Sequence, residues 1–178
     1  MEPQQRAELA QRMALQVVLA ARPLPTFVVC DNEAVASWAV GVGASVLWRP
    51  ANGLNSAVSQ GRNSLRAAGF DRLIIAHGDL PFATELAWVD QSDGITIVTD
   101  RRQDGTNVMA LPTDADFVFA YGAGSAAKHA AEAERIGLHC NIVLDAKLGW
   151  DVDVPEDLVG PDFDANLSTS TIAETEQS

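Results

Sequence analysis

Short apolar runs alternate with helical segments along most of the chain, and this alternation constrains the fold more than any other feature. Leu73–Ala76 is the clearest buried strand, and Thr26–Cys30 and Ser45–Trp48 are similar short runs. The segments between them, Asn32–Gly43 and Asn55–Ala68, have helical character, and a glycine ends each one. Strands that alternate with helices predict βαβ units, in which a mostly parallel sheet carries helices on both faces.

The rest of the chain extends this pattern into one α/β domain. Apolar residues spaced by four predict a first helix over about Gln5–Ala21. Further elements follow at Gly94–Thr99, Val108–Leu111 and Ile142–Leu144 (strands) and at Ser125–Ile136 (helix). We expect one domain over residues 1–159, because domains typically contain roughly 100–200 residues. From residue 160 the sequence is rich in Ser, Thr, Asp and Glu, which predicts a disordered acidic tail over residues 160–178.

The charge balance narrows the range of partners. The chain carries 24 acidic and 12 basic side chains, a formal net charge of -12. Such a field repels nucleic acid and anionic membrane surfaces, so we expect neither as a partner. It also repels a nucleoside triphosphate unless metal ions or local cations offset it. No apolar run is long enough for a membrane span and the N-terminus is polar, so we expect a soluble cytoplasmic protein.

Two groups of acidic residues are candidate metal ligands. Asp79 follows the Leu73–Ala76 strand, and ligands of open parallel sheets bind beyond the carboxyl ends of the strands. Asp151 and Asp153 alternate with apolar residues, so on an extended segment both carboxylates point to one side. Such carboxylates suit Mg²⁺. The alternatives are a helix cap for Asp79 and a solvated loop for the pair, while Glu156 and Asp157 suit the first turn of a helix.

Three loops are candidate binding segments. Arg101 and Arg102 lie in the polar loop 100–107 and could bind phosphate, although an ordinary hairpin turn has a similar sequence. The loop 121–125 opens a helix at Ser125, where an anion site and simple capping are both possible. Asn55 follows an Asn-Gly turn, and its amide could read a base edge. The absence of a P-loop and of a dinucleotide fingerprint disfavours P-loop hydrolysis and hydride transfer.

Five motifs in this order resemble the 2-phospho-L-lactate / phosphoenolpyruvate guanylyltransferase family. The motifs are Gly53–Ala57, Gly78–Pro81, Asp100-Arg101 with Asp104–Asn107, Gly122–Ser125 with His129, and Asp151–Leu158. With the first helix, the resemblance covers about Pro3–Leu158. It implies a Rossmann-like fold of the nucleotide-diphospho-sugar transferase type. The implied reaction transfers GMP from GTP to a phosphorylated three-carbon acid with release of pyrophosphate, in coenzyme F(420) biosynthesis.

The resemblance also implies roles for individual residues. Asp79 and Asp153 would be the catalytic Mg²⁺ ligands, with Asp151 beside them. The nucleotide would lie by Gly53, Leu54, Asn55 and Arg101. The acceptor, phosphoenolpyruvate or 2-phospho-L-lactate, would be held by Thr106, Gly122 and Ser125.

This sequence differs from the family at its start. Family members begin with a strand and a lysine-containing loop that grip the triphosphate, and no residue here matches that lysine in sequence order. The missing strand would belong in the middle of the sheet, so its loss would expose two strand edges. Two alternatives therefore accompany the guanylyltransferase prediction. One is a nucleotidyltransferase for another phosphorylated acid such as phosphoglycerate, and the other is a truncated, non-catalytic relative that binds the phospho-acid.

Overall fold

A computed structural model describes residues 2–48, 53–152 and 157 of the chain. The helices are α1 (Pro3–Ala20), α2 (Glu33–Gly41), α3 (Leu54–Ala67) and α4 (Ser125–Arg135), with a 3₁₀ turn η1 (Ala87–Asp90). The strands are β1 (Phe27–Cys30), β2 (Ser45–Trp48), β3 (Arg72–Ala76), β4 (Ile95–Thr99), β5 (Thr106–Pro112) and β6 (Cys140–Val143). These bounds agree with the sequence predictions within about two residues, except that η1 was not predicted. Asp153 and the predicted tail lie outside the described residues.

The strands form two sheets rather than one. β1 pairs with β2 in parallel, and the larger sheet has the order β3-β5-β4-β6. β4 and β6 are parallel, whereas β5 runs antiparallel to both of its neighbours. The short turn between β4 and β5 requires these two strands to be antiparallel, because a parallel connection needs a dozen or more residues. The α/β class is confirmed, and β5 is an antiparallel exception to the mostly parallel pattern, as the hairpin alternative for the loop 100–107 allows.

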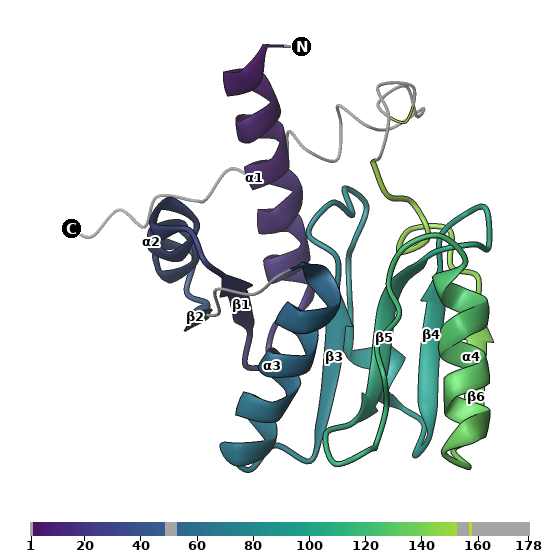
Figure 1. The fold of residues 1–178 in the computed structure, drawn as a ribbon. Helices are drawn as coiled ribbons and strands as arrows, with labels where there is room; N and C mark the ends of the chain where they lie inside the picture. The colour runs from purple at the N-terminus through teal and green to yellow at the C-terminus, as the bar shows by residue number, and fades with distance from the viewer. Residues whose placement is uncertain (1, 49–52, 153–156, 158–178) are drawn as a thin grey trace.

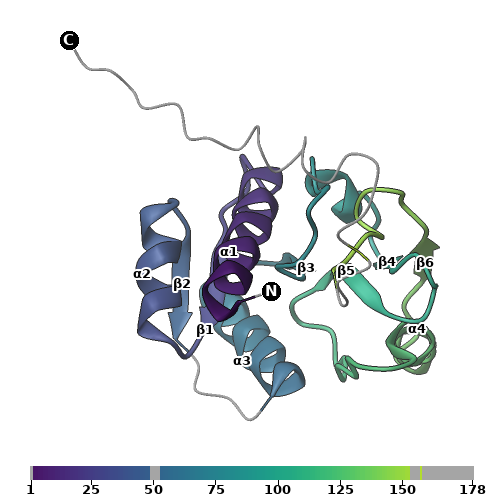
Figure 2. The same cartoon turned by 90° about the horizontal axis from the view of Figure 1, so that it is seen from above.

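The two faces of the larger sheet carry separate apolar clusters, because successive residues of a strand point to opposite faces. On one face Val17 and Ala20 of α1 pack with Ile74, Ala76 and residues of β4 and β5. On the other, Val58 of α3 and Ala133 of α4 pack with Leu73, Ile75 and further strand residues. Figure 2 shows α1 on one side of the strands and α3 and α4 on the other. The predicted coverage of both faces is confirmed.

The most buried strands are β4 and β5, not β3. Every residue of β4 is buried, whereas all five residues of β3 are half-buried. The prediction that Leu73–Ala76 is the clearest buried strand was therefore wrong. The reason is topological, because β3 is the first strand of its sheet and pairs on one side with β5. In Figure 1, β1 and β2 lie on the far side of β3 from β5.

The described residues include no helix that is long and apolar enough to cross a lipid bilayer.

Candidate active site

The loop after β3 carries Asp79 and is tied to β5. The amide of His77 donates to the carbonyl of Asn107 at 3.0 Å, which continues the β3–β5 pairing beyond Ala76. Two residues later Asp79 is half-buried, and Leu80 after it is fully buried in the core. Asp79 lies in this position because β3 ends at its last apolar residue and because the side chain of Leu80 packs the loop against the core. Asp79 therefore lies at the end of β3, as its position in the sequence predicts.

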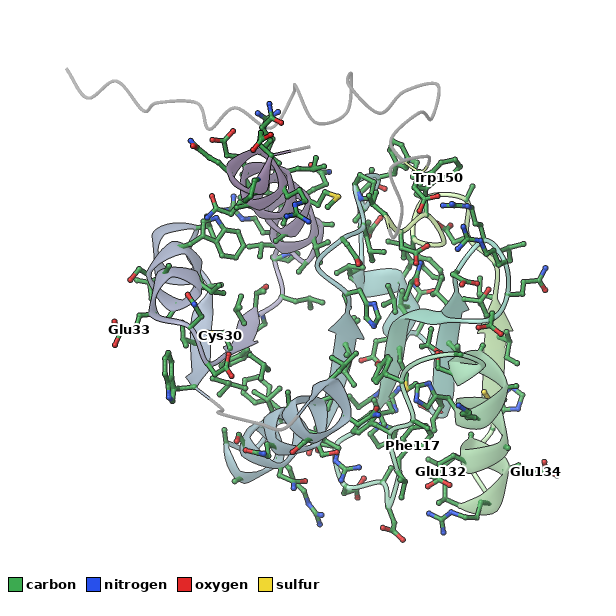
Figure 3. All side chains as sticks on the ribbon, turned by 45° about the horizontal axis from the view of Figure 1, so that its top comes forward. Cys30, Glu33, Phe117, Glu132, Glu134 and Trp150 are labelled. Carbon is green, nitrogen blue, oxygen red and sulfur yellow. The ribbon has the colours of Figure 1, made fainter. Side chains whose placement is uncertain are left out.

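Asp151 lies on a second loop, which packs against the first. The buried side-chain amide of Asn107 donates to the carbonyl of Leu148 at 3.0 Å, so the same residue holds both loops. The rings of Phe82 and Trp150 meet edge to face with centroids 5.7 Å apart. Trp150 is labelled in Figure 3 at the end of the molecule where the loops gather. The structure thus brings the loops of Asp79 and Asp151 into contact, while Asp153 lies outside the described residues.

Arg101 contacts three residues of the segment that contains Asp151. Its guanidinium lies 4.4 Å from the centre of the Trp150 ring, a cation–π contact. It also donates to the backbone carbonyl of Asp151 at 3.2 Å and pairs with the carboxylate of Asp157, which is 4% exposed. The arginine predicted to bind the nucleotide is thus engaged with the neighbouring segment. Its contact with a nucleotide stays a prediction.

The β4–β5 turn is joined to the start of α4. The carboxylate of Asp104 accepts from the amide of Gly124 at 2.9 Å, and its carbonyl accepts from the amide of Ala126 at 3.0 Å. The amide of Ser125 between them donates to the carbonyl of Gly122 at 3.0 Å. Three successive amides at the helix start are therefore used within the protein. An anion at this helix start would have to approach beside Asp104, which is itself anionic.

Asn55 links the start of α3 to the loop before α4. Its side-chain oxygen accepts from the amide of Tyr121 at 2.7 Å, and its nitrogen donates to the carbonyl of Tyr121 at 3.4 Å. Gly53 precedes α3 with a φ of 90°, a conformation that favours glycine. The predicted nucleotide loop and the predicted acceptor loop are therefore neighbours, joined through a single asparagine.

Thr106 and His129 form a buried pair beside these loops. Nδ1 of His129 lies 3.0 Å from Oγ1 of Thr106, and Nε2 accepts from the amide of Ala120 at 2.9 Å. Because Nε2 accepts, the ring proton belongs on Nδ1, which donates to Thr106. Burial lowers the pKa of His129 to about 4, assisted by Lys128 and His77 and opposed by Glu132. The imidazole is therefore neutral at pH 7.

The residues predicted to bind the nucleotide and the acceptor differ in their exposure to solvent. Gly53, Leu54 and Asn55 are exposed, and so is Gly122. Thr106 and Ser125 are each 2% exposed. Of the three predicted acceptor contacts, Gly122 is thus the one that a ligand reaches directly in this conformation. The acceptor roles of all three residues stay predictions.

Several residues of this region were not singled out from the sequence. Trp150 contacts Arg101, as does Asp157, which was expected only in the first turn of a helix, and Asn107 joins two loops across the sheet. His77 is a further such residue, and the centre of its ring lies 5.3 Å from that of Tyr121. The one sequence signal for these contacts was the density of polar residues after each strand.

The donor set suits a hard divalent cation, although the described residues alone do not complete a site. Asp79 and Asp151 offer carboxylate oxygens on loops that pack together, which is the chemistry Mg²⁺ prefers. No group of three or more His, Cys, Asp or Glu side chains with metal-binding geometry occurs among residues 2–48, 53–152 and 157. The third predicted ligand, Asp153, is not among these residues.

Comparison with known proteins identifies the family. The model of the family described as "Guanylyl transferase CofC like" matches residues 1–161. The chain belongs to this family. The nucleotidyltransferase class expected from the motifs is confirmed at this level, and the CofC-like match covers the whole of the described domain.

Relatives of this chain carry three different acceptor names. A phosphoenolpyruvate guanylyltransferase of Chloroflexus aggregans is 30% identical over 169 residues, covering 88% of this chain and 84% of the relative. A 3-phospho-D-glycerate guanylyltransferase of Phenylobacterium zucineum is 30% identical, covering 75% of this chain and 64% of the relative. A 2-phospho-L-lactate guanylyltransferase of Methanothrix thermoacetophila is 33% identical and covers 52% of this chain and 43% of the relative.

A solved structure supports the fold. It comes from Desulfovibrio desulfuricans G20 and is described as a nucleotide-diphospho-sugar transferase. The TM-score is 0.63 at 14% identity, with 91% of this chain and 84% of that chain covered. The predicted fold type is confirmed.

Proposed function

We propose that this protein transfers GMP from GTP to phosphoenolpyruvate or 2-phospho-L-lactate, with release of pyrophosphate, in coenzyme F(420) biosynthesis. The observation that carries the proposal is the pair of hydrogen bonds between Asn55 and the backbone of Tyr121. Through them the candidate nucleotide loop and the candidate acceptor loop adjoin at one edge of the sheet. The names of the CofC-like relatives give the same reaction class.

In the proposed reaction an oxygen of the acceptor phosphate attacks the α-phosphorus of GTP. The bond from that phosphorus to the oxygen bridging the β-phosphate breaks, and pyrophosphate leaves. The chemistry needs positioning and charge neutralisation more than a protein nucleophile. Mg²⁺, held by Asp79, Asp151 and Asp153, would supply that neutralisation. A chain with a net charge of -12 needs such a cation to admit a triphosphate.

The acceptor is tested by comparing three acids. Initial rates of pyrophosphate release with GTP and Mg²⁺ are measured for phosphoenolpyruvate, 2-phospho-L-lactate and 3-phospho-D-glycerate in parallel. We expect one of the first two to be preferred by at least tenfold in kcat/KM. A preference for 3-phospho-D-glycerate would contradict the proposed acceptor and assign the chain to the phosphoglycerate alternative.

The second candidate function is binding of the phospho-acid without turnover. The division of the strands into two sheets favours it, because a broken sheet positions the loops on its two halves less firmly. Calorimetry with phosphoenolpyruvate, with and without GTP, separates the two functions. Heat of binding in both cases without pyrophosphate release would support the binding protein.

A further inference from the structure

The strand β6 forms an open edge of the larger sheet. In the part of the chain that the structure describes, β6 pairs with β4 alone, at the end of the order β3-β5-β4-β6. In Figure 1 this edge and α4 lie at the side of the molecule farthest from β1 and β2. We call the outward side of residues 139–145 the β6 edge. It runs along the side of the sheet, whereas the candidate active site lies in loops at the ends of strands.

Every second residue of the β6 edge directs its backbone groups outward. The amide of Ile95 donates to the carbonyl of His139 at 2.8 Å, and Ile95 lies opposite Cys140 in the register. In a parallel pair this pattern turns the backbone groups of His139, and of each second residue after it, toward β4. The N–H and C=O groups of Cys140, Ile142 and Leu144 therefore point away from the sheet, toward any further strand.

The β6 edge lacks the charges, prolines and bulges that usually keep an edge strand from pairing. Residues 136–144 contain no Asp, Glu, Lys, Arg or Pro. The register between β4 and β6 runs without a shift from Ile95 to Val98. Ile142 and Leu144 are 54% and 57% exposed. A straight, uncharged edge with exposed apolar side chains is a template for a further strand.

The side of α4 next to the β6 edge carries short side chains. Glu132 accepts from the amide of Val118, in the loop that lies between α4 and α3. Glu134 lies on the opposite side of the helix from Glu132, as Figure 3 shows. Helical spacing of three and four places Ala127 and Ala130 on the same side as Glu134. Because two of these three side chains are alanines, a second helix can approach α4 closely here.

We propose that the β6 edge pairs antiparallel with the β6 edge of a second copy of this chain, so that two larger sheets join across a twofold axis. In such a contact both copies use the same surface. The net charge of -12 makes two copies repel each other, so their contact belongs where acidic side chains are absent. Residues 136–144 are such a stretch. The same stretch offers no carboxylate to recruit a basic partner, which favours a second copy over a foreign strand.

One register of the two β6 edges uses all of their outward backbone groups. With the twofold axis at Ile142, this residue faces itself in the second copy, and Cys140 faces Leu144. Each of these pairs can exchange two N–H···O bonds. The same register places the exposed His139 of each copy opposite Asp145 of the other, a ring N–H donor opposite a carboxylate. The apolar side chains of Ile142 and Leu144 would then be covered, since they adjoin the same side chains of the second copy.

Sedimentation velocity of the full chain in a reducing buffer, over about a hundredfold range of concentration, tests the proposal. We expect a reversible equilibrium between monomer and dimer. Ile142→Lys should raise the dimer dissociation constant at least tenfold, because two ammonium groups would meet at the axis. Val118→Lys is the matched control, since Val118 is 62% exposed away from the β6 edge, and it should dimerise as the unmodified chain does. A monomer at every concentration, or undiminished dimerisation of Ile142→Lys, would overturn the proposal; in the first case the edge is left for a different polypeptide.

A cross-link at the axis tests the register itself. Opposite residues of a hydrogen-bonded antiparallel pair have Cα atoms about 5.5 Å apart, within the range that a disulfide spans. Ile142→Cys should therefore form a covalent dimer in an oxidising glutathione buffer at least tenfold faster than Val118→Cys. Both variants retain Cys30 and Cys140, so the unmodified chain measures the background. Equal rates in the two variants would overturn pairing in this register.

Discussion

The guanidinium of Arg101 lies 4.4 Å from the centre of the Trp150 ring. It also forms an ion pair with the carboxylate of Asp157 and donates a hydrogen bond to the backbone carbonyl of Asp151. One residue of the β4–β5 turn thereby holds the segment that carries a candidate metal ligand. The ring nitrogen of Trp150 donates to the carbonyl of Asp157 at 3.2 Å, which closes the segment on itself. The position of Asp151 at the sheet edge depends on this arginine.

Arg101→Ala should destabilise the protein by about 3 kcal/mol, because it removes the nearer of the two arginines that pair with the buried carboxylate of Asp157. Urea unfolding measures the change in the free energy of unfolding. The matched control is Arg102→Ala, whose side chain is 55% exposed and lies 3.8 Å from Asp157. It should cost less than about 1 kcal/mol. Equal losses in the two variants would contradict the account of this segment.

The stability of the protein should fall as the pH is lowered through the range in which His129 takes up its proton. The pKa is lowered to about 4 in the folded protein from an ordinary value of 6.5, so the unfolded chain binds the proton first. The contribution of neutral His129 to the free energy of unfolding is complete above pH 6.5 and is lost as the pH falls toward 4. At pH 5 about 2 kcal/mol is lost relative to pH 7.

Urea unfolding at pH 7 and pH 5 checks this, with His129→Gln as the comparison. The variant lacks the titrating ring, so its loss between the two pH values should be smaller than that of the unmodified protein by about 2 kcal/mol. The other charged groups near the ring, Lys128, Glu132 and His77, are present in both proteins. Parallel pH profiles for the two proteins would show that His129 is not buried in its neutral form.

Asn55→Ala should lower activity far more than stability. The two hydrogen bonds to Tyr121 are exposed and neutral, so their loss should cost about 1 kcal/mol in unfolding. The separation of the nucleotide and acceptor loops should nonetheless reduce kcat/KM at least tenfold. Asn63→Ala, also exposed on α3, is the control and should leave kcat/KM unchanged. A change in stability without a change in kcat/KM would mean that the link is purely structural.

The sequence predicted the elements well because each one carries a local signal. The α2 helix begins after Asn32, whose side chain accepts from the amides of Ala34 and Val35, as an N-cap asparagine should. The burial of β3 could not be predicted in the same way. Its apolar run is the same whether or not a strand lies on its other side, and burial depends on that neighbour.

The candidate site was predicted at the level of loops but not at the level of contacts. Asp79 was placed at the sheet edge because it follows the Leu73–Ala76 strand, whereas Asp151 was singled out by its alternation with apolar residues. Arg101 was expected to face a ligand, yet it stacks on Trp150, 49 positions later in the sequence. Such long-range pairs have no local signature. They depend on the meeting of loops that only the folded sheet brings together.

The most direct test of the account is pyrophosphate release by the unmodified protein and by Asp79→Asn, each with GTP, Mg²⁺ and phosphoenolpyruvate or 2-phospho-L-lactate. We expect release that requires GTP, acceptor and Mg²⁺ together, and a fall in kcat of at least about 100-fold in Asp79→Asn, as when a charge-stabilising group is removed. Asp114→Asn, an exposed carboxylate outside these loops, should retain full activity. Release that persists in Asp79→Asn, or that needs no acceptor, would contradict metal-assisted guanylyl transfer at this edge of the sheet.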